Sequence, residues 1–130
     1  MVHKTLAMAL LAAATAPVYA QGVAIESAVF LEHSDGHGMR VEPAERFVSG
    51  DRVVTVLRWQ APGQRRFTVV SPVPTGLRVE SVSRAGLEVS TDRGRSWQVL
   101  SDARELPRGV THLRWRAGGD GQLTYRAVVR

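Results

Sequence analysis

One stretch decides the fold class of this chain, and it reads RVVTVLRWQ at Arg52–Gln60. In an extended chain successive side chains point to opposite faces, so alternate residues share one face. The more apolar face of this stretch comprises Val53, Thr55, Leu57 and Trp59. The opposite face carries two arginines, Arg52 and Arg58. This pattern predicts a β-strand with one face on a hydrophobic core and the other toward solvent.

Similar short segments recur between glycine and proline residues through the rest of the chain. The expected strands are 24–32, 39–46, 52–60, 67–71, 77–83, 87–90, 96–100, 110–116 and 123–130. No stretch after Gln21 repeats apolar residues at helical spacing. Seven to nine short strands at this spacing predict an all-β fold, an antiparallel β-sandwich or small barrel. We expect four aromatic residues to anchor its core: Trp59, Phe67, Trp115 and Tyr125.

Residues 1–20 have the pattern of a signal peptide. A lysine precedes an uncharged apolar run at 5–16, which is too short to span a bilayer. Val18 and Ala20 then supply the small residues that signal peptidase requires before the bond it cleaves. We therefore predict an exported single domain at 21–130, in the periplasm or the extracellular space, with no membrane span after cleavage.

The composition excludes several classes of protein and site. The chain has 130 residues, no cysteine, and 17 basic against 12 acidic residues. Without cysteine there are no disulfides, thiolate metal ligands or cysteine nucleophiles. The arginines are scattered among acidic residues, so nucleic acid is not an expected partner. No nucleophile elbow, phosphate-binding loop or dinucleotide-binding motif is present, so we expect neither an enzyme nor a bound cofactor.

Several elements occur in an order found in a known family. They are Gly50-Asp51 before the strand at 52–60, Phe67–Ser71 before a proline loop and Gly76-Leu77, Leu87–Ser90 before a turn at Asp92 and Gly94, and a final strand from Gly121 to Val128. Across Val41 to Arg130 they resemble a conserved-repeat family of bacterial surface proteins of unknown function. The resemblance implies an immunoglobulin-like β-sandwich, here in a single copy, in the cell envelope or extracellular space. We expect a structural or interaction role, with an envelope polymer or another envelope protein as partner.

The segment Ser90–Trp97 reads STDRGRSW and resembles the Asp-box hairpin of sialidase-type propellers. In such a hairpin the aspartate, here Asp92, caps turn amides, while Gly94 adopts a positive φ and Trp97 packs beneath. A propeller needs several blades, and this chain has one copy of the motif. The motif therefore predicts a structural hairpin and no glycosidase activity.

A second motif, at His33, Asp35 and His37, contains candidate metal ligands. Two imidazoles and a carboxylate at alternate positions of a strand could hold zinc or copper, with His112 as a further candidate ligand. However, Asp35-Gly36 is also a turn signal, which would separate the two histidines. We interpret the segment 33–38 as a turn, and a small periplasmic metal-binding protein remains an alternative.

The last two expected strands carry the chain's candidate interaction surface. They are joined by the glycine-rich link 118–121, which favours a hairpin. In a hairpin their outward residues would form one arginine face beside His112, made of Arg114, Arg116, Arg126 and Arg130. Arginine forks pair with phosphate and carboxylate, so this face is a candidate binding site for an anionic envelope polymer. The alternative is that solvent alone covers these arginines.

Overall fold

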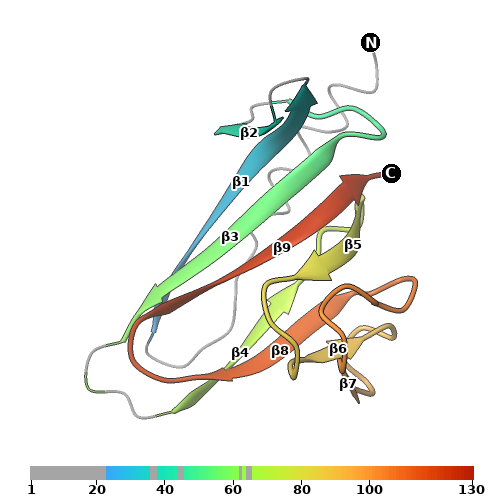
Figure 1. Cartoon of the computed structure of the whole chain (residues 1–130). Helices are drawn as coiled ribbons and strands as arrows, with labels where there is room; N and C mark the ends of the chain where they lie inside the picture. Colours follow the sequence, from blue (N-terminus) through green and yellow to red (C-terminus); the bar gives the residue numbers. More distant parts are fainter. Residues whose placement is uncertain (1–22, 36–37, 44–45, 62, 64–65) are drawn as a thin grey trace.

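The protein is an all-β sandwich of two antiparallel sheets. The computed structural model describes residues 23–35, 38–43, 46–61, 63 and 66–130, which form nine strands and no helix (Figure 1). Within these residues there is therefore no helix long and apolar enough to cross a membrane. The expected fold class is confirmed, whereas the predicted signal peptide at 1–20 lies outside the described residues.

The two sheets differ in size, and all paired strands run antiparallel. The five-stranded sheet has the order β2 (Gly38–Pro43), β1 (Ala24–Asp35), β3 (Arg52–Gln60), β9 (Gly121–Val129), β5 (Leu77–Val82). The four-stranded sheet has the order β4 (Phe67–Pro72), β8 (His112–Ala117), β6 (Glu88–Ser90), β7 (Gln98–Val99). The strand at 52–60 was predicted with its observed bounds, and the other strands lie within a few residues of theirs.

The first hairpin corrects one expectation. The turn predicted at 33–38 is too long, because β1 continues to Asp35 and β2 already begins at Gly38. His33 lies opposite Arg40, and the ladder continues to Asp35 opposite Gly38. Pairing of the two backbones thus outweighs the weak local turn preference at the start of this segment.

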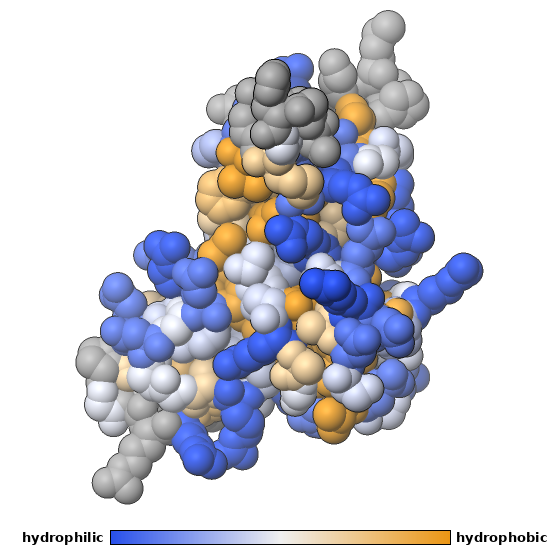
Figure 2. All heavy atoms as spheres, viewed as in Figure 1, coloured by the Kyte–Doolittle hydropathy of each residue, from blue (hydrophilic) through white to orange (hydrophobic). Residues whose placement is uncertain are grey.

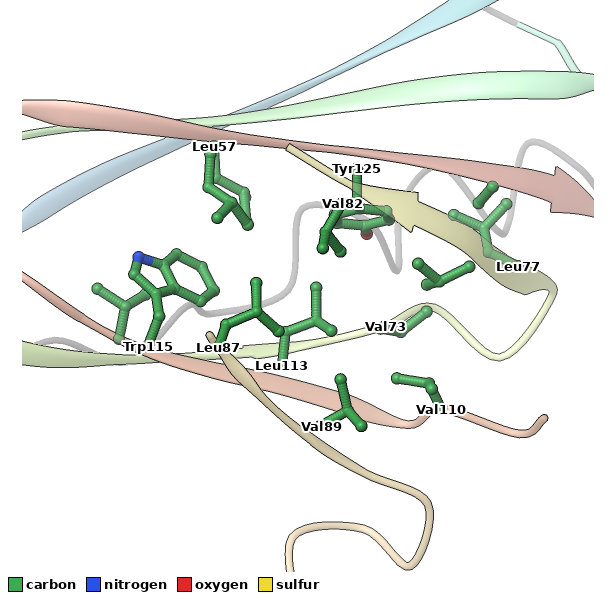
Figure 3. Close-up of a cluster of buried hydrophobic side chains, with 14 of the residues drawn as sticks. Leu57, Val73, Leu77, Val82, Leu87, Val89, Val110, Leu113, Trp115 and Tyr125 are labelled. Atoms are coloured by element: carbon green, nitrogen blue, oxygen red, sulfur yellow. The ribbon is translucent and has the colours of Figure 1, made fainter. Parts of the chain in front are cut away.

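The core lies between the two sheets, where the expected faces meet. The four residues expected on the inner face of β3 are all at most 3% exposed. Figure 3 shows Leu57 and Tyr125 of the five-stranded sheet pointing toward Leu113 and Trp115 of the four-stranded sheet. Trp59 and Trp115 also touch across the core, with ring centroids 5.8 Å apart.

Three of the four expected aromatic anchors are buried, and the fourth is a correction. Phe67 only packs against the margin of the core and stays partly exposed. It opens β4, an edge strand that pairs with β8 alone. An aromatic residue at the end of an edge strand has neighbours on fewer sides, so alternation alone overestimates its burial.

The expected hairpin of the last two strands is wrong. β8 pairs with β4 and β6, whereas β9 pairs with β3 and β5 in the other sheet. Both strands bury their apolar sides in the shared core, so their outward sides lie on opposite outer faces of the sandwich. Arg114 and Arg116 therefore lie on one face, Arg126 lies on the other, and Arg130 follows β9. The predicted single arginine face does not form.

Candidate functional site

Two arginines of the predicted face are already paired with carboxylates. Arg114 donates from Nε and Nη2 to the two carboxylate oxygens of Glu88, at 3.1 and 2.8 Å. These bonds hold the pKa of Glu88 below its ordinary value, and the Arg114 guanidinium also stacks 4.1 Å from the centre of the Trp97 ring. Arg126 donates from Nε to Glu32 Oε2 at 3.0 Å. Both arginines therefore already have a carboxylate partner within the protein.

The candidate metal ligands are not brought together in the part of the chain that the structure describes. His33 Nε2 lies 2.8 Å from Glu42 Oε1 across the first hairpin. His112 belongs to the other sheet, where its Nδ1 lies 3.0 Å from Thr111 Oγ1. His37 and the side chain of Asp35 lie outside the described residues. Among those that are described, no three His, Asp or Glu side chains could hold one metal ion.

The Asp-box segment forms the expected capped turn between β6 and β7. Asp92 Oδ1 accepts from the Ser96 amide at 2.9 Å and from Ser90 Oγ at 2.7 Å, and Oδ2 accepts from Ser96 Oγ at 2.6 Å. Gly94 has a φ of +86°, and a Cβ added there would lie 3.5 Å from the Trp97 ring. The Asp92 carboxylate thus forms its hydrogen bonds within the turn, as the sequence motif predicts.

Removal of the Asp92 carboxylate should destabilise the protein in a pH-dependent way. Hydrogen bonds donated by the hydroxyl and the amide of Ser96, and next by the hydroxyl of Ser90, hold the pKa of Asp92 well below its ordinary value. Its stabilising effect is therefore complete above the ordinary Asp pKa of about 4 and declines as pH falls toward the lowered folded value. Asp92→Ala should lower the melting temperature at pH 7, with a smaller difference from wild type at pH 3. A difference that stays constant in melts from pH 7 to pH 3 would contradict this role.

At one end of the sandwich, at the lower left of Figure 1, β3 and β8 end and β4 and β9 begin. This end holds a pocket that was not predicted from the sequence. It has a volume of about 430 Å³. Its arginines are Arg66 before β4, Arg84 after β5 and Arg116 in β8. The remaining lining residues are Trp59, Ala117, Gly118, Asp120, Gly121 and Gln122. We call this site the arginine pocket, and Figure 2 shows hydrophilic side chains gathered over this end of the molecule.

The arginine pocket has an excess of positive charge. None of its three guanidinium groups forms an ion pair with any residue that the structure describes. Arg84 Nη2 donates a long bond of 3.4 Å to the backbone oxygen of Arg116, which places these two residues side by side. The one carboxylate in the lining is Asp120, whose Oδ1 accepts from the Ala61 amide at 2.9 Å. Three positive charges and one negative charge favour an anionic ligand.

Trp59 gives the pocket a buried hydrogen-bond donor with no partner. The residue is only 3% exposed, and its indole Nε1 has no acceptor in the described structure. A Cβ added to Gly121 would lie 3.0 Å from Nε1, so the indole edge lies directly against this glycine. Trp59 and Gly121 both line the arginine pocket. Buried donors are normally satisfied, so this N–H is an exception, as is that of Trp115, which does not line the pocket.

No local sequence motif predicts this site, because its residues come from separate segments of the chain. Arg66 and Arg84 lie outside the strands, and of the pocket's arginines only Arg116 was in the predicted face. The glycine-rich link at 118–121 is the only local signal. It marks the point where the chain crosses between sheets and brings β3, β8 and β9 to one end.

Comparison with protein-family models, with curated proteins and with solved structures found no match for this chain. The resemblance to a conserved-repeat family of bacterial surface proteins therefore stays a prediction.

Proposed function

We propose that this protein is an exported, non-enzymatic β-sandwich module that binds an anionic polymer of the cell envelope at the arginine pocket. The observation that carries the proposal is the convergence of Arg66, Arg84 and Arg116 on one pocket, without an ion pair in the described structure. Export is supported by the signal-peptide pattern of residues 1–20. The binding site replaces the arginine face expected from the sequence and retains only Arg116 from it.

The chemistry of the pocket suits phosphate or carboxylate groups. Guanidinium groups that lie close together repel one another, and a bound anion would relieve this repulsion. A guanidinium also presents parallel N–H donors at the spacing of carboxylate and phosphate oxygens. Each charge-assisted bond of this kind contributes about 1.5–3 kcal/mol when it is shielded from water.

The proposal predicts that three substitutions remove binding. Arg66→Gln/Arg84→Gln/Arg116→Gln should weaken binding of poly(glycerol phosphate) or polygalacturonate at low salt by about 10- to 100-fold, as expected when several charge-assisted bonds are lost. The matched control is Arg95→Gln/Arg104→Gln/Arg108→Gln, because these three arginines are also exposed and lie outside the pocket lining. Isothermal titration calorimetry on both variants and wild type measures the effect, with neutral dextran as a blank.

Two further measurements separate pocket binding from general attraction. Asp120→Asn removes the negative charge of the lining but keeps the oxygen that accepts from Ala61, so it should tighten binding. Wild-type affinity should fall steeply between about 10 and 150 mM salt, since exposed charges are screened over this range. A folded pocket variant that binds as tightly as wild type would refute the site. If wild type fails to bind at low salt, only a structural role is left.

A further inference from the structure

The arginine pocket continues into a second depression. The second depression is lined by Trp59, Asp120, Gly121 and Gln122, which also line the arginine pocket, and adds Arg58 and Gln60. The two depressions therefore adjoin at the end of β3 and the start of β9, and we call the pair the groove. Three arginines line one depression, and a fourth, Arg58, lines the other.

Arg58 is exposed at its end of the groove and forms no ion pair in the described structure. Its side chain is exposed, and it lies opposite Gln122 on one side and Glu26 on the other side of the ladder. Its contact with Gln122 Oε1 is long, at 3.4 Å. No ion pair joins Arg58 to Glu26 or to any other acidic residue in the described structure. A ligand anion could therefore pair with this guanidinium.

Asp120 places a negative charge between the three arginines of one depression and Arg58 of the other. It lines both depressions and is the single acidic residue in the lining of either. A polymer with charges in immediate succession would place one of them near this carboxylate, and like charges repel. A polymer with charges separated by hydroxyl-bearing units would meet no such repulsion. Hydroxyl groups could instead donate to the oxygens of Asp120 and Gln122.

We propose that the groove selects a linear polymer whose phosphate groups are separated by uncharged sugar or polyol units. One phosphate occupies the arginine pocket, the uncharged unit crosses Asp120, and the next phosphate pairs with Arg58. This inference rests on the proposed function and adds the spacing of charges as the recognised feature. Once the first phosphate is bound, the second contact is intramolecular, with an effective concentration in the millimolar range.

The test is a length series of glycerol phosphate oligomers with one, two, four and eight phosphates. The affinity of wild type should rise by about tenfold or more between one and four phosphates, because of the added intramolecular contact. Arg58→Gln should remove most of this rise. The matched control is Arg52→Gln, on the same outward side of β3 but paired with Glu80 at 2.6 Å. NMR titration follows weak and tight ligands alike, and the indole N–H signal of Trp59 reports on the pocket.

Charge spacing is tested by comparison with linear polyphosphate of equal phosphate number. Wild type should prefer the glycerol phosphate chain, and Asp120→Asn should reduce this preference. A length series that is flat, or that rises equally in Arg58→Gln, overturns the inference. In that case the proposed function still stands if the triple pocket variant loses binding of the single phosphate. If neither these oligomers nor polygalacturonate binds wild type, the proposed function itself fails.

Discussion

Trp115→Ala is expected to lower the free energy of unfolding by about 3–5 kcal/mol, the range for removal of a large aromatic side chain from a core. Trp115 is 4% exposed and points from the four-stranded sheet into the space between the sheets (Figure 3). Trp59→Ala should have a similar effect, since its ring lies 5.8 Å from that of Trp115. Urea denaturation of both variants measures the two changes.

Two arginines next to these tryptophans provide the control. Arg58→Ala and Arg114→Ala change the adjacent, outward side chain of the same strand and should each cost well under half as much. Of the two, Arg114→Ala should cost more, because it removes the ion pair with Glu88 and the stack on Trp97. Exposed pairs of this kind contribute about 0–1 kcal/mol. Equal costs for tryptophan and arginine would mean that the strand register is shifted by one residue.

The features of the fold that could be predicted are those that short stretches encode. The alternation in RVVTVLRWQ predicted the bounds of β3 and its buried face, since the inward side has no charged residue whereas the outward side carries an arginine near each end. The turn at Asp92 and Gly94 was equally local, because the hydrogen bonds of the Asp92 carboxylate and the Ser90 hydroxyl join residues at most four apart. For such features a few residues contain all the groups that determine the geometry.

The site could not be predicted, because it depends on which sheet each strand joins. β8 and β9 are consecutive and both have one apolar side, so a hairpin and a crossover bury the same residues. Only long-range pairing, of β8 with β4 and β6 and of β9 with β3 and β5, separates the two arrangements. The crossover moves Arg126 to the opposite outer face and leaves Arg116 beside Arg84. The arginine pocket is thus a consequence of topology.

Gly121→Ala is expected to destabilise the protein by about 1–3 kcal/mol, the usual cost of overpacking a filled core. The added Cβ would lie 2.7 Å from Cζ2 and 2.9 Å from Cε2 of Trp59, inside van der Waals contact with a rigid ring. Elsewhere in a strand, alanine stabilises relative to glycine by roughly 0.5–1 kcal/mol. Gly121 has no positive φ that would strain an alanine. The sign of the effect is therefore set by the indole, and chemical denaturation measures it.

A double-mutant cycle attributes the cost to this contact. In a Trp59→Leu background the ring is absent, so Gly121→Ala should be neutral or slightly stabilising. The coupling free energy between the two positions should then be about as large as the destabilisation that Gly121→Ala causes in wild type. The same clash should act on function, because relieving it shifts Trp59 or Gly121, and both residues line the arginine pocket. A folded Gly121→Ala protein should therefore bind poly(glycerol phosphate) more weakly than wild type. Unchanged affinity together with clear destabilisation would show that the contact between Trp59 and Gly121 stabilises the start of β9 but does not shape the binding site.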